Sequence, residues 1–329
     1  GNETVTISDT ELASSVLNTL DGNTSGAVNA ATVTTLTGTA AAANTAYASS
    51  GITGLGNEAV TLSDTSLASS VLNTLDGNTT GAVNAATVTT LTGTAATANT
   101  AYASNGITGL GDEAVTLSDT SLATTVLNTL DGNTTGTVNA ATVTTLTGAA
   151  AAVITTYDSS GISGLGNEKL TLSGSTSVAN ANTLAADTTG VITATITETD
   201  AATLATLTET TNAYTITVGD TSVTAANLNT IDGATTVAVT ATAVTTITGE
   251  ASAVTTAYGS SGINGLGNTI VKGLSLFPSP PAKITQSRLF KFSIFSIISF
   301  HKITLTTFPL FKIGNTLILC LIIKFFANL

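Results

Sequence analysis

The chain has 329 residues and a formal net charge of −12, with 42% hydrophobic and only 9% charged residues. All 20 acidic residues lie in residues 1–272, opposed only by Lys169 and Lys272, so this part carries −18 and residues 273–329 carry +6. An acidic body argues against binding to nucleic acid or anionic lipid, because both need clustered Lys and Arg. Residues 1–272 contain no Cys, which excludes a disulfide framework or a thiolate zinc site there.

A 55-residue repeat organises the first half of the chain. Residues 1–55, 56–110 and 111–165 align without a gap, and the first two copies differ at only six positions. A variant block, residues 166–266, follows and closes with a related Gly-Ile-Asn-Gly-Leu word. Copies this regular predict a stacked architecture, because each unit must bury its apolar face on a neighbour. The chain opens without Met at the point where each copy opens, so we interpret it as a fragment of a longer array or a mature piece.

The first half of the second copy predicts a strand followed by a helix. Residues 59–62 alternate apolar and polar side chains, which is typical of a short strand. A cluster of N-cap formers follows, and apolar residues then recur at helical spacing. We therefore expect a helix over Ser66–Asp76, with Gly77 as its C-terminal cap.

The second half of the copy repeats this order. Residues 82–84 predict a second, shorter strand. The apolar spacing from Val88 to Tyr102 predicts a second helix, which Gly93 interrupts and Gly106 caps.

Strand starts recur at separations of about 23 or 32 residues, and the variant block fits the same spacing with two extra short coils. The sequence therefore predicts an α/β fold, a right-handed solenoid of stacked strand–helix coils whose strands form one continuous parallel sheet. The many Thr and Val residues leave a pure β-solenoid as the alternative. The strands expected to pair in succession start at Val5, Val28, Val60, Val83, Val115, Val138, Leu170, Ile192, Ile216 and Val239.

Two glycine-containing words resemble known ligand-binding motifs. The word Asp76-Gly77-Asn78-Thr79-Thr80-Gly81 resembles the start of a calcium loop, with equivalents at Asp21 and Asp131, but Thr87 stands where an EF-hand needs Glu. These three aspartates are weak calcium candidates, and otherwise we expect stacked, mutually repelling carboxylates. The word from Gly54 to Ala59 fits a loose dinucleotide fingerprint, but it precedes a strand, so we interpret it as a turn.

Catalysis has little support in residues 1–272. No His or Cys is present to act as base or nucleophile, and carboxylates such as Asp64 and Asp76 recur from copy to copy. We predict a non-catalytic protein without a cofactor, calcium being the one candidate. Glycans or other copies of this chain are the expected partners, through one face of the solenoid.

Residues 273–329 form a different kind of sequence. This tail holds all nine Phe, all four Pro, His301 and Cys320, and no acidic residue. Three interpretations compete: a membrane anchor, a cap on the repeat array, or non-native sequence from a shifted reading frame. The apolar stretch Ile313–Leu329 is short for a membrane span and contains Lys324.

The repeat words resemble those of a known class of proteins. Leu72-Asn73-Thr74-Leu75-Asp76-Gly77, Val88-Thr89-Thr90-Leu91-Thr92-Gly93 and Gly106-Ile107-Thr108-Gly109-Leu110-Gly111 are similar to repeats in very large secreted or cell-surface proteins of marine cyanobacteria. The resemblance covers residues 1 to about 268. It implies an extracellular or cell-surface location and a structural, adhesin-like or S-layer-like role, sometimes beside calcium-binding repeats.

Overall fold

The computed structural model describes residues 1–266, 270–271, 311–313 and 316–318. The chain divides into two units, residues 1–274 and 275–329. The described part of the second unit is an antiparallel pair, β24 (Phe311–Ile313) with β25 (Thr316–Ile318). The rest of the predicted anchor, cap or frame-shifted tail lies outside the described residues. Among the helices that the structure does describe, none is both long and apolar enough to cross a bilayer.

Each regular copy folds into five short strands and two helices. The first copy contains β1 (Val5–Thr6), β2 (Glu11–Ala13), α1 (Ser14–Asn23), β3 (Val28–Asn29), β4 (Thr35–Gly38), α2 (Ala40–Ala48) and β5 (Ile52–Thr53). The second contains β6 (Ala59–Leu62), β7 (Ser66–Ala68), α3 (Ser69–Asn78), β8 (Val83–Asn84), β9 (Thr90–Gly93), α4 (Ala95–Ala103) and β10 (Ile107–Thr108). The third contains β11 (Ala114–Leu117), β12 (Ser121–Ala123), α5 (Thr124–Asn133), β13 (Val138–Asn139), β14 (Thr145–Gly148), α6 (Ala150–Asp158) and β15 (Ile162–Ser163).

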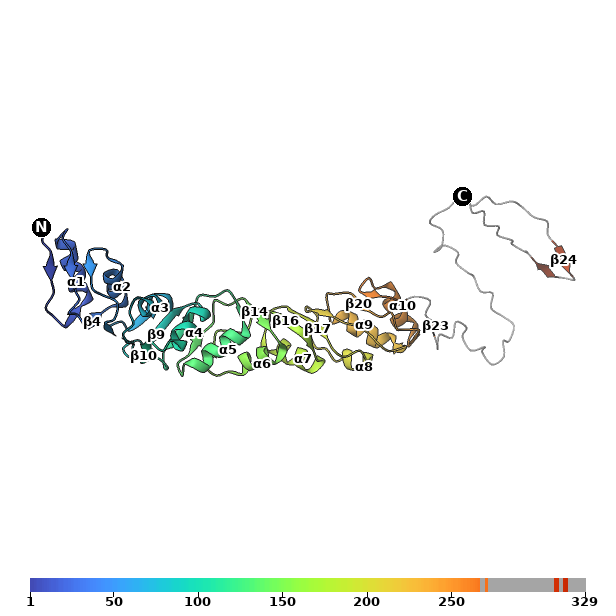
Figure 1. Cartoon of the computed structure of the whole chain (residues 1–329). Helices are drawn as coiled ribbons and strands as arrows, with labels where there is room; N and C mark the ends of the chain where they lie inside the picture. Colours follow the sequence, from blue (N-terminus) through green and yellow to red (C-terminus); the bar gives the residue numbers. More distant parts are fainter. Residues whose placement is uncertain (267–269, 272–310, 314–315, 319–329) are drawn as a thin grey trace. The chain divides into compact units, whose positions relative to one another are not determined.

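The variant block continues the alternation of strands and helices with less regular lengths. It contains β16 (Lys169–Thr176), α7 (Val178–Asp187), β17 (Ile192–Ile196), α8 (Ala201–Leu204), β18 (Ala213–Thr215), β19 (Ser222–Thr224), α9 (Ala225–Gly233), β20 (Val239–Thr240), β21 (Thr246–Thr248), α10 (Ala251–Gly259) and β22 (Ile263–Asn264), and β23 (Ile270–Val271) follows. The helix α8 has four residues, whereas the others described have nine or ten. Successive helices lie side by side from α1 to α7 and again from α8 to α10 (Figure 1).

The strands of residues 1–271 form several short parallel sheets, so the α/β prediction is confirmed and the pure β-solenoid is wrong. Strand pairing in this unit is parallel throughout the described residues, an arrangement compatible with a repeat solenoid. The predicted pairs Val5 with Val28, Val60 with Val83, Val115 with Val138 and Leu170 with Ile192 are confirmed in register. Ile216 lies outside a strand, next to a bridge from Thr217 to Thr240.

The prediction of one continuous sheet is wrong. Val28 pairs with Ile52 and not with Val60, which pairs with Leu36 instead. The 32-residue coil is also not seen, since Val83 pairs with Ile107, 24 residues later. The reason is that each copy holds strands that the apolar pattern alone assigned to helices or turns, namely β7, β9 and β10 in the second copy.

The helix boundaries differ from the prediction for the same reason. Leu67 lies on β7 opposite Leu91 of β9, so pairing of these strands delays both helices. Gly93 ends a strand with φ of +138° and does not interrupt a helix. Gly77 lies inside α3, and Gly106 lies beyond the end of α4. The predicted N-cap cluster caps a different helix, because Asp64 Oδ2 accepts the N–H of Ala40 in α2 at 2.8 Å.

The core consists of the inward-facing strand residues and one face of each helix. The first helix of each regular copy buries leucines, such as Leu72 and Leu75 of α3. The second helices of the first two copies, α2 and α4, bury only alanines. Alternating large and small side chains lets successive helices pack closely, as in interdigitated cores. Truncation of a buried Leu to Ala in such a layer typically costs about 2–5 kcal/mol.

An asparagine ladder links the successive helices from α1 to α6. Asn18 Nδ2 donates to the Ala42 carbonyl at 2.8 Å, Asn44 Nδ2 to Val71 at 3.0 Å and Asn73 Nδ2 to Thr97 at 2.8 Å. In the third copy, Asn128 Oδ1 also accepts the Thr156 hydroxyl at 2.7 Å. The equivalent oxygens of Asn18 and Asn73 are buried without a partner, because Ala46 and Ala101 stand in place of Thr156.

This difference between copies predicts opposite effects of two substitutions. Thr156→Ala should destabilise the protein by about 1 kcal/mol, because it leaves Asn128 Oδ1 buried and unpaired. Ala101→Thr should stabilise it by a similar amount, because it supplies the missing donor to Asn73. Urea unfolding midpoints measure both effects. Thr155→Ala, at an exposed position of the same helix, controls for helix propensity; an equal loss in Thr155→Ala and Thr156→Ala would contradict the assignment.

Candidate functional site

The aspartates that were weak calcium candidates belong to a repeated contact that we call the Asp–Ser latch. Ser104 Oγ donates to Asp76 Oδ2 at 2.7 Å, and the Gly106 N–H donates to Ser104 Oγ at 3.0 Å. A side chain at Gly106 would collide with the Asp76 carboxylate, so the latch requires glycine. The same latch joins Asp21, Ser49 and Gly51; Asp131, Ser159 and Gly161; and Asp232, Ser260 and Gly262.

The remaining groups of the calcium-like word point to other partners. Asn78 Nδ2 donates to Asn44 Oδ1 at 2.9 Å, and the Thr79 hydroxyl donates to the Glu58 carbonyl at 2.7 Å. Asp76 itself lies in the last turn of α3, and not at the start of a loop. Nowhere in the described parts of the chain do three His, Cys, Asp or Glu residues gather as a metal site.

The three aspartates also do not form an uninterrupted column. Asp21, Asp76 and Asp131 lie on α1, α3 and α5, and α2 and α4 pack between these helices. Each carboxylate therefore meets a serine of the intervening coil instead of another carboxylate. The predicted stack of repelling charges is wrong for this reason.

The word that resembled a dinucleotide fingerprint encloses a buried glutamate. Glu58 is fully buried, and its Oε2 accepts the Gly56 N–H at 2.8 Å, the Asn57 N–H at 3.2 Å and the Tyr47 hydroxyl at 3.0 Å. The backbone N–H groups that would bind a phosphate are thus already occupied, in agreement with the interpretation as a turn. Glu113 and Glu168 repeat the contact with Tyr102 and Tyr157, and Oε1 of all three glutamates is buried without a hydrogen-bond partner.

Burial and the neighbouring glutamate raise the pKa of Tyr47, Tyr102 and Tyr157 well above the usual range of tyrosine. These phenols therefore stay protonated and donate to the glutamates at neutral pH. A carboxylate with no exposed surface cannot contact a bound substrate, so we assign this Tyr–Glu pair a structural role.

The variant block lacks one latch. Asn182 donates to the Thr206 carbonyl just after α8, as Asn73 donates to Thr97 in α4, which aligns α7 with α3 and places Ala185 where Asp76 stands. The following helix, α8, is too short to bring a Ser-x-Gly turn to this position. A hollow of about 220 Å³ opens here, and Ala185, Thr188, Thr189, Gly190, Glu209, Thr211 and Asn212 line it.

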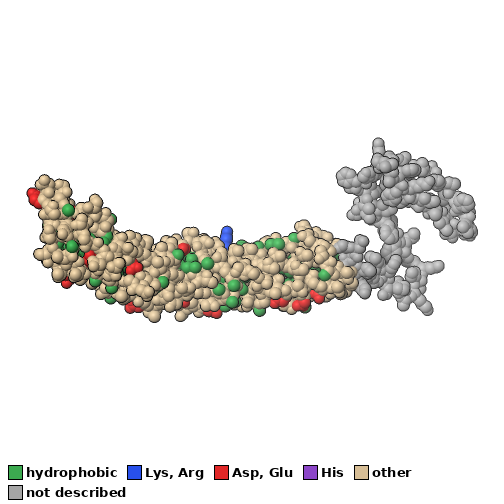
Figure 2. Space-filling model, in the orientation of Figure 1, with side chains coloured by type: hydrophobic (Ala, Val, Ile, Leu, Met, Phe, Trp, Pro, Cys, Tyr) green, Lys and Arg blue, Asp and Glu red, His purple; other side chains and the backbone are tan. Residues whose placement is uncertain are grey.

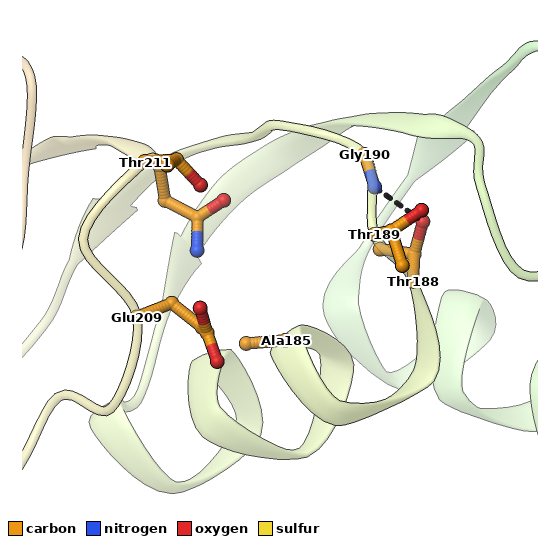
Figure 3. Close-up of a pocket in the computed structure, with 7 residues that line it drawn as sticks. Ala185, Thr188, Thr189, Gly190, Glu209 and Thr211 are labelled. Carbon is orange, nitrogen blue, oxygen red and sulfur yellow. Dashed lines mark hydrogen bonds between the residues drawn. The ribbon is translucent and has the colours of Figure 1, made fainter.

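The two walls of the hollow come from successive coils. Thr188 to Gly190 follow α7, and Glu209 to Asn212 follow α8 (Figure 3). Figure 3 shows the Glu209 carboxylate pointing toward Ala185 across the hollow. The Thr188 hydroxyl is engaged, because it accepts the Gly190 N–H at 3.0 Å and donates to the Glu168 carbonyl at 2.8 Å.

Asn212 holds the second wall in place. It is 2% exposed; its Oδ1 accepts the Ile192 N–H at 2.8 Å, and its Nδ2 donates to the Tyr214 hydroxyl at 3.0 Å. Tyr214 occupies the position of the buried glutamates, since its carbonyl accepts Thr235 as that of Glu58 accepts Thr79. Burial, with a contribution from the Glu209 charge, raises the pKa of Tyr214 to about 12.

The distribution of charged side chains over the rest of the described surface does not indicate a second binding site. Figure 2 shows acidic side chains spread along the visible face of residues 1–266 and a single basic group. Lys169 is the one basic residue of that range, and it is exposed. The hollow in the variant block is therefore our candidate functional site.

Comparison with known proteins gives no functional assignment, since no family model, curated protein or solved structure matches the chain. The sequence patterns alone did not reveal the candidate site. The signal that would have revealed it is a missing aspartate. The helices α1, α3, α5 and α9 each have Asp three residues after an Asn, whereas α7 has Ala185 three residues after Asn182. The buried glutamates had a signal too, because each follows a Tyr by 11 residues.

The latch predicts how the protein responds to cations. Because Asp21, Asp76 and Asp131 are each hydrogen bonded to a serine, we expect sodium and calcium at equal ionic strength to raise the thermal midpoint alike. Differential scanning calorimetry after exhaustive chelation measures this. A calcium-specific rise at micromolar concentration, lost in Asp76→Asn, would show that the aspartates bind calcium instead.

The raised pKa of Tyr214 predicts a loss of stability at alkaline pH. The folded protein holds this phenolic proton more tightly than the unfolded chain, so the stabilisation is complete below about pH 10 and is lost as the pH rises toward 12. We expect Tyr214→Phe to flatten the fall of the urea midpoint between about pH 10 and about pH 12. Tyr258→Phe, at a tyrosine that is 42% exposed, is the control for removal of a phenolic hydroxyl group.

Proposed function

We propose that residues 1–272 form a non-catalytic structural or adhesive module of a large extracellular or cell-surface protein. In this proposal the strand–helix units continue as a right-handed solenoid and act as an acidic spacer or display stalk. The observation that carries the proposal is the pairing of strands across copy boundaries: β4 with β6, β9 with β11 and β14 with β16. Each copy completes a sheet of its neighbour, as expected of an array in which each repeat contacts only its neighbours.

Three further features support a structural role. The recurring carboxylates bond to serines, helix ends or tyrosines within the fold, which leaves them little capacity for chemistry. Residues 1–272 contain neither His nor Cys. The similarity of the repeat words to those of large marine cyanobacterial surface proteins favours the same role and location.

A second function has its own supporting observation. The hollow beside Glu209 is a polar depression at α7, where Ala185 replaces the latch aspartate found in α1, α3, α5 and α9. It favours a glycan-binding surface within the same module, with the regular copies serving as the stalk that presents it.

The spacer role predicts how the array yields to force. Since sheets extend across copies, the copies should not unfold one at a time. In optical-tweezers experiments on the full chain, we expect length steps larger than one copy. Repeated steps of about 200 Å, the extended length of a single 55-residue copy at about 3.6 Å per residue, would contradict the proposal.

A further inference from the structure

The hollow in the variant block presents an exposed carboxylate and an exposed hydroxyl group, at the position where the regular coils bond an aspartate to a serine. At equivalent positions elsewhere, an aspartate and a serine satisfy each other. Here Ala185 removes the aspartate, and the Glu209 carboxylate faces it from the next coil without a hydrogen-bond donor (Figure 3). The Thr211 hydroxyl beside it likewise makes no bond to the protein, so both groups are available to a ligand.

The chemistry of the lining selects among ligand classes. An anion is disfavoured, because Glu209 is the charged group of the lining and the surrounding repeat is acidic. A calcium ion is also disfavoured, since it needs six or more oxygen ligands and a single carboxylate supplies two at most. A pair of adjacent hydroxyl groups fits best, because a carboxylate accepts from both and threonine hydroxyls complete the contact.

The volume of the hollow narrows the choice of ligand further. The volume of about 220 Å³ lies below that of sites for drug-sized ligands, which begin at about 300 Å³. A single sugar ring is the matching size. The wall is also held rigidly, since both polar ends of the Asn212 side chain are hydrogen bonded.

From these observations we propose that the hollow binds one neutral sugar residue of a glycan, with Glu209 accepting hydrogen bonds from two adjacent hydroxyl groups. Thr189 and Thr211 flank the ring, and the absence of a side chain beyond Cβ at Ala185 makes the space for it. This inference rests on the glycan-binding alternative of the proposed function and is independent of the spacer role, which the force experiment tests separately.

The test is a titration of the full chain, labelled with ¹⁵N, with the methyl glycosides of glucose, galactose, mannose and N-acetylglucosamine. We expect saturable shifts of the Gly190 and Thr211 amide signals with at least one of these sugars. Glu209→Gln should weaken binding by about tenfold, as expected for loss of a charged acceptor. Asp112→Asn makes the same charge change at an exposed acid of a regular copy and should leave the affinity unchanged.

A second variant distinguishes sugar binding from cation binding at the hollow. Ala185→Asp restores the latch residue of the other coils, fills the hollow and places a second carboxylate opposite Glu209. The proposal requires this variant to lose sugar binding while a cooperative thermal transition shows that it is still folded. Shifts caused by calcium chloride alone and strengthened in Ala185→Asp would overturn it in favour of a cation site. Sugar shifts that persist in Glu209→Gln, or no sugar shifts at all, would overturn it outright.

Discussion

The structure depends on one interaction, the pairing of the first strand of each copy with a strand of the copy before it. Leu36 lies opposite Val60, Leu91 opposite Val115 and Leu146 opposite Leu170, always 24 residues apart. A strand of four residues has too few hydrogen bonds and too little buried surface to persist alone. Each copy therefore reaches its native conformation only against a neighbour, and the local elements of a single copy are a consequence of the stack.

The side-chain bonds follow from this stacking. Parallel coils place equivalent positions of successive coils next to each other, so a residue type that bonds well once is repeated along the array. The asparagines link helix to helix, the Asp–Ser latch links one helix end to the next turn, and threonine hydroxyls reach the preceding coil, as Thr89 does to the Thr65 carbonyl at 3.1 Å. The threonine-rich composition thus reflects inter-coil bonding as well as β propensity.

Sequence reasoning predicted the fold class, the parallel pairing of Val60 with Val83 and the strands at residues 59–62 and 82–84 with good accuracy. It failed where helical spacing and strand pairing compete for the same residues. Leu67 and Leu91 fit a helix by spacing, but they lie opposite each other on two strands, a long-range contact that no local pattern contains. The candidate site was missed because Ala185 is an unremarkable residue until its neighbours are known.

The equivalence of the junctions between copies has a consequence for the gene. Because the strand pairs at the first, second and third boundaries have the same register, removal or duplication of a regular 55-residue copy joins surfaces that already fit. The array can therefore change its length by unequal recombination, one copy at a time, without the evolution of a new interface. The variant block does not share this freedom, since its short α8 and single missing latch have no duplicate elsewhere in the described chain. The number of regular copies can thus change while the block keeps its own surface.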